Sequence, residues 1–232
     1  MDHDRFPTTR WSLIERIAES GPLAEFLERY RPALLAFLKH EPGSRSADVE
    51  DLVQGFIADK VLQNQILRRA RAGKGRLRNF LIRSLRNYVM NVHRSERASR
   101  RAPLGKVSLE EIGVEHVGSR EAESRFELEW ARSVLNEALE RMQSECEKKD
   151  MSDHWGIFRD RVIDPILNGR EPPSYAALAE RYRFTSPHAA GNRLVTAKRM
   201  YAKSIRSVIS EYTTDPVEVE EELEELFRAL SR

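Results

Sequence analysis

A strongly basic segment, residues 68–101, places the tightest constraint on what the first half of this chain can form. Arginine and lysine recur throughout the segment, and its only acidic residue is Glu96. The 232-residue chain as a whole has a formal net charge of only +2, so the positive charge is concentrated locally. A basic run with so little acid favours a surface that faces a polyanion.

The spacing within this segment predicts an amphipathic helix, because residues three or four positions apart share one helical face. Apolar residues define a face that should be buried: Leu77, Leu81, Leu85, Tyr88 and Val92. Polar residues define the opposite face: Arg76, Asn79, Arg83, Asn87, Arg94, Arg97 and Arg101. Phe80 lies at the border, where its ring could stack on a base while the arginines hold the phosphates. The alternative is a solvated arginine-rich helix with Phe80 in the core.

The remaining sequence predicts an all-α fold. Runs of alternating β-branched residues and Asn-Gly or Asp-Gly hairpin signals are missing from the chain. One helix is expected over residues 23–39, where Pro32 should kink or split it, and another from Ser46 onward. No apolar run approaches the roughly 18 residues that cross a bilayer, and the N-terminus lacks a signal-peptide core, so we expect a cytoplasmic protein.

Cysteine and histidine usage argues against metal or disulfide chemistry. Cys146 is the only cysteine, which excludes an intramolecular disulfide and a cysteine zinc site within one chain. The six histidines include no pair at helical spacing. We therefore expect no metal and no cofactor. Enzyme signatures are also missing: there is no nucleophile elbow, and Ala-Gly-Lys-Gly at residues 72–75 is too short for a phosphate-binding loop.

Composition divides the chain into four parts. Residues 1–101 should form a first helical domain, and residues 126–210 a second. Between them, Pro103, Gly105, Gly113 and Gly118 interrupt any apolar period, which predicts a flexible linker over residues 102–125. Residues 211–232 form an acidic C-terminal extension with an apolar ridge. By default it is a solvated amphipathic helix; it could also pack on the second domain or cover a basic surface.

The second domain contains a pattern typical of a helix-turn-helix. Ser174 can cap a short helix, and Ser186 followed by Pro187 can begin a longer one. The buried face of the longer helix is predicted to be Ala190, Leu194, Ala197, Tyr201 and Ile205, and its outer face His188, Asn192, Thr196, Arg199 and Lys203. In a helix-turn-helix the second helix enters the major groove of DNA. A plain helical hairpin within an α-helical core is the alternative.

On the DNA-binding interpretation, His188 and Asn192 lie nearest the base edges, and Arg193, Lys198 and Arg199 reach phosphates or guanines. Gly191 weakens this helix by up to about 1 kcal/mol relative to alanine, and close approach of a partner is one possible reason for it.

Three motifs occur in order: SADVEDLVQGF, then GRLRNFLIRSLRNYVMNVHRS, and after the linker SYAALAERYRFTSPHAAGNRLVTAKRMY. With this order and spacing, the chain resembles the extracytoplasmic-function (ECF) group of bacterial RNA polymerase sigma factors, and within it the subgroup that opens with a motif like TTRWSLI. The resemblance covers nearly the whole chain. It implies a non-enzymatic factor that binds core polymerase and directs promoter recognition and opening in transcription initiation.

The resemblance also implies partners and roles. The first domain would dock on the β′ coiled coil of the polymerase, with the β subunit as a further contact, and would open the minus-ten element. The second domain would bind the minus-thirty-five element, while the linker would run through the RNA-exit path. An anti-sigma factor is a further partner that the resemblance allows. A helix-turn-helix regulator that binds duplex DNA without polymerase is the alternative function.

The residues assigned to each role form three sets. The strand-opening set is Arg76, Arg78, Asn79, Phe80, Arg83, Arg86, Asn87, Asn91, Arg94 and Arg97. The minus-thirty-five set is Ser186, His188, Asn192, Arg193, Thr196, Lys198 and Arg199. The polymerase-docking set is Asp48, Glu50, Asp51 and Gln54.

Overall fold

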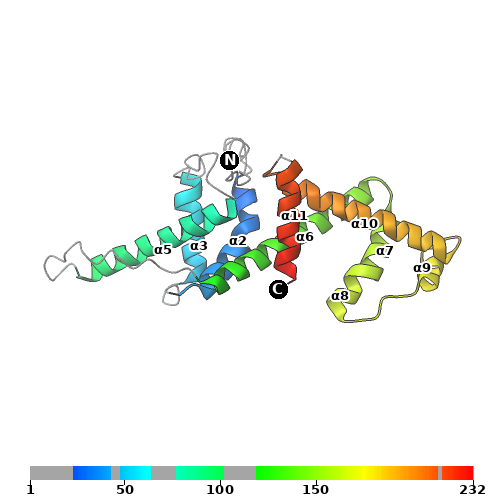
Figure 1. The fold of residues 1–232 in the computed structure, drawn as a ribbon, viewed down its shortest axis with the longest axis horizontal. Helices are drawn as coiled ribbons and strands as arrows, with labels where there is room; N and C mark the ends of the chain where they lie inside the picture. Colours follow the sequence, from blue (N-terminus) through cyan, green and yellow to red (C-terminus); the bar gives the residue numbers. More distant parts are fainter. Residues whose placement is uncertain (1–22, 43–47, 64–76, 102–118, 214–215, 232) are drawn as a thin grey trace, which may run out of the picture. The chain divides into compact units, whose positions relative to one another are not determined.

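The computed structural model describes residues 23–42, 48–63, 77–101, 119–213 and 216–231, with backbone alone for 23–28, 60–63 and 96–101. The described residues are helical, with no strand among them, which confirms the all-α prediction (Figure 1). The elements in chain order are α2 (Leu23–His40), α3 (Val49–Gly55), η1 (Phe56–Gln63), α5 (Leu77–Arg101), α6 (Arg120–Lys148), α7 (Ser152–Phe158), η2 (Arg159–Ile163), α8 (Asp164–Asn168), α9 (Tyr175–Arg181), α10 (Pro187–Ile209) and α11 (Pro216–Leu230), of which η1 and η2 are π-helical.

The chain divides into two compact units. The first comprises residues up to Ser133 together with Glu211–Arg232, and the second comprises Val134–Ser210. This division differs from the predicted one in two ways. Helix α6 already begins at Arg120, within the predicted linker, and continues across the predicted boundary at residue 126. The acidic extension belongs to the first unit. Residues 102–118 of the predicted linker lie outside the described part of the chain.

The core of the first unit lies where α2, α3, η1 and α5 meet. Its largest fully buried side chains are Phe37, Phe56, Phe126, Leu34, Leu38, Leu81 and Leu85. The apolar face predicted for residues 77–92 is confirmed at Leu77, Leu81 and Leu85, whereas Tyr88 and Val92 are half-buried. Helix α2 continues through Pro32, so the predicted split does not occur.

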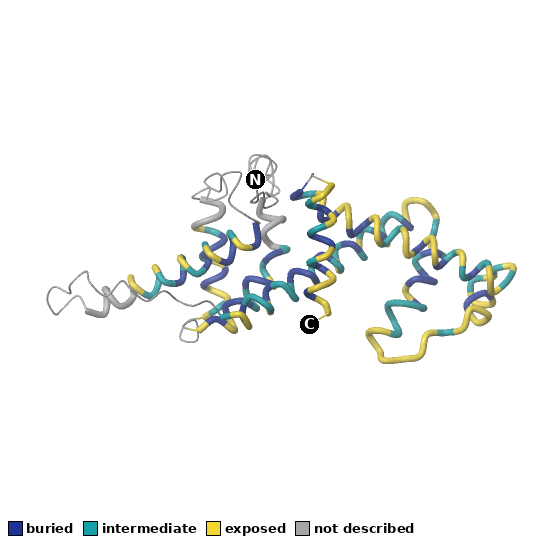
Figure 2. The backbone as a smooth tube through the Cα atoms, in the orientation of Figure 1, coloured by how far each residue is buried: buried dark blue, intermediate teal, exposed yellow. Residues whose placement is uncertain are grey.

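Helix α11 completes the first unit. Its apolar side buries Val219, Leu223 and Leu226, while Phe227 remains 59% exposed. The sequence places Leu223, Leu226, Phe227 and Leu230 on one apolar ridge, of which Leu223 and Leu226 are buried and Phe227 and Leu230 are exposed. Figure 2 shows the alternation of buried and exposed positions along this helix.

The second unit is built around α10, which packs on α7 and α9. Its core includes Met142, Ile157, Phe158, Leu178, Ala190, Leu194 and Ala197. The aromatic ring of Tyr182 lies against Gly156, where any side chain would collide with it. Gly169 ends α8 in the left-handed conformation, with φ 60°. No helix in the described ranges is both long and apolar enough to cross a membrane.

Candidate nucleic-acid interface

Helix α5 exposes a row of polar and basic side chains, hereafter the α5 row: Asn79, Arg83, Asn87, Asn91 and Arg94. These residues recur every three or four positions, so they lie along one side of the helix. Their exposure follows from the burial of Leu81, Leu85 and Val89 on the other side. Phe80 is half-buried at the edge of the row. The predicted face is thus present, and Asn91 belongs to it.

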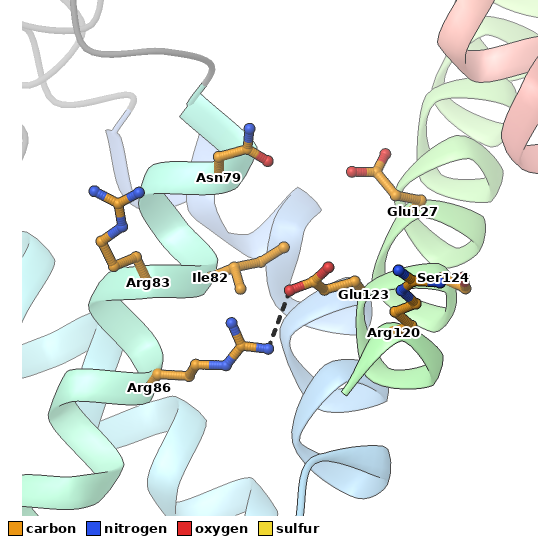
Figure 3. Close-up of a pocket in the computed structure, with 8 residues that line it drawn as sticks. All are labelled: Asn79, Ile82, Arg83, Arg86, Arg120, Glu123, Ser124 and Glu127. Atoms are coloured by element: carbon orange, nitrogen blue, oxygen red, sulfur yellow. Dashed lines mark hydrogen bonds and ion pairs between the residues drawn. The ribbon is translucent and has the colours of Figure 1, made fainter. Parts of the chain in front are cut away.

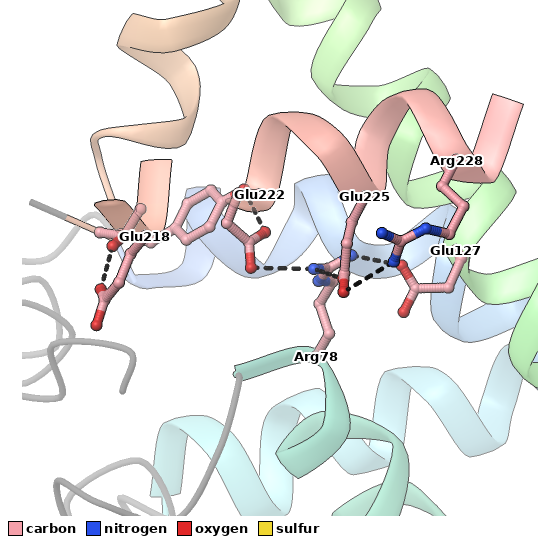
Figure 4. A network of polar contacts seen from close by, with 8 residues as sticks. Arg78, Glu127, Glu218, Glu222, Glu225 and Arg228 are labelled. Atoms are coloured by element: carbon pink, nitrogen blue, oxygen red, sulfur yellow. Dashed lines mark hydrogen bonds and ion pairs between the residues drawn. The ribbon is translucent and has the colours of Figure 1, made fainter. Parts of the chain in front are cut away.

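Arg78 does not belong to the α5 row, although the sequence placed it in the strand-opening set. It is 2% exposed, and its guanidinium pairs with Glu127 of α6 and with Glu222 and Glu225 of α11, the last two at 3.0 and 2.7 Å (Figure 4). The guanidinium also stacks on Trp130, 3.8 Å from the ring centroid. Burial alone would lower the pKa of Arg78, but Glu222 and Glu127 outweigh it and raise the pKa. Arg78 therefore joins three helices of the first unit and is closed to a ligand.

Arg86 also points away from the α5 row. Its Nε donates to Glu41 at 2.6 Å. Its Nη2 donates to Glu123 of α6 at 3.1 Å (Figure 3). The guanidinium lies 5.0 Å from the centroid of the Phe37 ring. This correction has the same cause as that at Arg78: Glu41 and Glu123 are distant in sequence, so the helical pattern alone does not reveal these contacts.

A polar cavity of about 670 Å³ lies between α5 and the start of α6. Figure 3 shows the residues that line it: Asn79, Ile82, Arg83, Arg86, Arg120, Glu123, Ser124 and Glu127. Arg120 is exposed and adds a positive charge to the lining of the cavity, on the α6 side. Sequence reasoning missed it because residue 120 fell within the predicted linker. Ser119 was the available signal, since its hydroxyl caps α6 by accepting from the Ala122 amide at 3.2 Å.

The four residues of the predicted docking set lie at α3 and are all exposed: Asp48, Glu50, Asp51 and Gln54. Asp48 is the N-cap, and its Oδ1 accepts from the amide of Glu50 at 2.9 Å. Glu50 pairs with Arg31 of α2 at 2.5 Å. The N-terminal end of α3 is therefore negatively charged, and negative charge at this end interacts favourably with the helix dipole.

The end of α9 is fixed by a buried carboxylate. Asp160 in η2 accepts hydrogen bonds from Arg159 at 3.0 Å, Arg181 at 2.5 Å and the hydroxyl of Tyr182 at 2.8 Å. Burial alone would raise the pKa of Asp160, but these three donors outweigh it and lower the pKa. Burial and the same carboxylate raise the pKa of Tyr182 to about 12.

Helices α9 and α10 have the predicted caps and faces. Ser174 and Ser186 accept hydrogen bonds from the amides of Ala177 and Ala189 at 3.2 and 3.1 Å. The predicted buried face of α10 is confirmed except at Tyr201, which is half-buried. The predicted outer face is exposed at all five positions: His188, Asn192, Thr196, Arg199 and Lys203. Lys198 is exposed as well, whereas Ser186 is half-buried and engaged as a cap.

Arg193 is held by α7, so it is less available to DNA than the sequence suggested. Its Nε lies 3.1 Å from Asp153, and its Nη1 donates to Nε2 of His154 at 3.2 Å. Because arginine cannot accept, Nε2 of His154 must be unprotonated, and Nδ1 carries the proton that bonds Asp153 at 2.8 Å. Arg193 thus anchors α10 to α7.

Two residues of the strand-opening set cannot be placed: Arg76 lies outside the described residues, as does the side chain of Arg97. Within the described ranges, no group of three or more histidine, cysteine, aspartate or glutamate side chains is arranged to hold a metal ion. No family model and no curated protein matches the sequence, and no solved structure matches the fold.

Proposed function

We propose that this protein is a bacterial RNA polymerase sigma factor of the ECF group, which binds core polymerase and directs promoter opening. The observation that carries the proposal is the α5 row, a line of exposed amide and guanidinium groups on a helix whose only acidic residue is Glu96. Such a line suits a single nucleic-acid strand, because arginines hold phosphates while amides bond base edges.

The row supplies the chemistry that strand opening needs. Taking a base out of a duplex stack costs a few kcal/mol. Phosphate contacts from Arg83 and Arg94 and a stacking surface at Phe80 would offset that cost. In this assignment Arg78 and Arg86 position α5, and they do not touch DNA.

The other two residue sets fit the same assignment. The exposed carboxylates of Asp48 and Asp51 and the amide of Gln54 form an accessible surface for the β′ coiled coil of the polymerase. The exposed face of α10 would bind the minus-thirty-five element through the major groove. A factor with these partners acts in the cytoplasm.

Two experiments test the proposal. Transcript starts mapped after overexpression should share two upstream elements at fixed spacing, and purified protein should bind core polymerase in the absence of DNA. A regulator that acts without polymerase would instead shift duplex DNA unaided and show no affinity for core polymerase. That second outcome would overturn the proposal in favour of a helix-turn-helix repressor or activator.

A further inference from the structure

Gly191 occupies a place in α10 where the protein itself does not require glycine. Among the residues that the structure describes, a Cβ at this position would meet only Cε1 of Tyr175, at 3.9 Å, which is ordinary van der Waals contact. Gly156 is different, because a Cβ there would lie 2.6 Å from the Tyr182 ring. Glycine weakens a helix relative to alanine. Packing among the described residues thus explains Gly156 and does not explain Gly191.

Val195 is a second notable residue on α10, because packing among the described residues leaves its apolar side chain partly exposed. It is 47% exposed, and its β-branched side chain slightly lowers helix propensity. Val195 lies one turn beyond Gly191, and both lie on the same side of the helix as His188, Asn192 and Arg199. The outer face of α10 therefore has a small gap at Gly191 and one exposed apolar side chain, Val195, among its polar groups.

The Tyr175 ring forms one wall of this gap, and it is fixed in place. Arg161 stacks on the ring with 4.8 Å between the guanidinium and the centroid. The same guanidinium donates to the carbonyls of Pro172 and Pro173 at 2.8 and 2.7 Å. Tyr175 is 39% exposed. The surface beside Gly191 is thus preformed.

We propose that Gly191 and Val195 determine how α10 recognises duplex DNA. The missing side chain at Gly191 lets the edge of the major groove approach the helix backbone, and Val195 then packs on the methyl group of a thymine. The methyl group distinguishes thymine in the major groove, and apolar side chains recognise it. This inference rests on the proposed binding of duplex DNA by α10, and it adds a sequence preference to it.

The test uses the full-length protein bound to core polymerase and a duplex that this wild-type complex enriches from a random-sequence library. Gly191→Ala should raise the melting temperature by about 2–5 °C, because alanine favours the helix. The same variant should weaken duplex binding by at least about fivefold, because the added methyl keeps the groove away. Ala202→Gly, at an exposed position of the same helix, is the control: its melting temperature should fall while its affinity stays unchanged.

The thymine contact is tested by replacing each thymine of that duplex with uracil, which removes only the methyl group. At one position the replacement should weaken wild-type binding about threefold, as burial of a single methyl predicts. Val195→Ala should bind more weakly and should not respond to the replacement at that position.

Unchanged or tighter binding by Gly191→Ala would overturn the inference and leave duplex recognition by α10 in place. An equal response of wild type and Val195→Ala to uracil would also overturn it. Failure of the wild-type complex with core polymerase to enrich any duplex would remove both the inference and the duplex-binding part of the proposed function.

Discussion

Nη2 of Arg78 lies 3.0 Å from a carboxylate oxygen of Glu222, 144 residues away along the chain. This contact ties the first turn of the basic helix α5 to the acidic helix α11, and Glu127 of α6 completes it. The acidic extension is therefore a structural part of the first unit.

Breaking this contact should destabilise the first unit. Glu222→Gln removes the charge that compensates a buried guanidinium, so the free energy of unfolding should fall by about 1–3 kcal/mol. Urea denaturation followed by circular dichroism measures this, and hydrogen exchange should show faster opening of α11. Glu224→Gln removes the same charge from an exposed position of α11 and should change stability by less than about 0.5 kcal/mol. Equal effects of the two variants would contradict the account.

The α5 row should matter for DNA and not for polymerase. Replacing Arg83, Asn87 and Arg94 together with alanine should lower the yield of open promoter complexes by at least about tenfold, because strand contacts are lost. Binding to core polymerase, measured by fluorescence anisotropy, should stay near the wild-type value. A control that removes two other exposed charges, Arg125→Ala with Arg170→Ala, should retain opening. Loss of polymerase binding in the triple variant would mean that the face has been misassigned.

The exposed end of α3 should matter for polymerase binding. Asp51→Ala combined with Gln54→Ala should weaken binding to core polymerase by about tenfold or more, as expected for central interface residues. Neither side chain is buried, so the melting temperature should be unchanged. Glu121→Ala, an exposed carboxylate on α6, serves as the matched control. Wild-type affinity in the double variant would remove this assignment.

The buried carboxylate of Asp160 should give the second unit an acid-sensitive component of stability. The folded state lowers the pKa of Asp160 below the unfolded value of about 3.9, so its contribution is present above that pH and is lost as the pH falls through the folded pKa. Asp160→Asn should therefore have a lower melting temperature than wild type at pH 7, and the difference should shrink below about pH 4. Calorimetry at a series of pH values measures it. A difference that stays constant down to pH 2.5 would refute this role.

Helical periodicity made the faces of α5 and α10 predictable, since both helices are long and regular. The spacing of Trp155, Phe158, Val162 and Ile166 also predicts one buried helical face, but Ile166 is 76% exposed. The π-helical segment η2 spans Arg159–Ile163, and its extra residue per turn rotates the face that follows. An α-helical spacing rule cannot detect such a turn.

The burial of Arg78 was predictable from the sequence, but the partners of its guanidinium were not. Arg78 lies three, four and seven positions before Leu81, Ile82 and Leu85, so its place on the buried face was visible in the sequence. Its partners on α6 and α11 depend on how distant helices pack, which periodicity does not specify. The boundary between the two units was unpredictable for the same reason. The apolar stripe of α6 looks uniform in the sequence, although residues up to Ser133 belong to the first unit and those from Val134 to the second.

Permanganate reactivity of promoter thymines tests the central claim most directly, because the reagent oxidises unpaired thymines much faster than thymines stacked in a duplex. The promoter is one identified by mapping transcript starts after overexpression. With core polymerase and this protein, thymines around the minus-ten element should become reactive, and the Arg83, Asn87 and Arg94 triple variant should leave them protected. Reactivity that is the same with core polymerase alone, or that persists in the triple variant, would contradict the account.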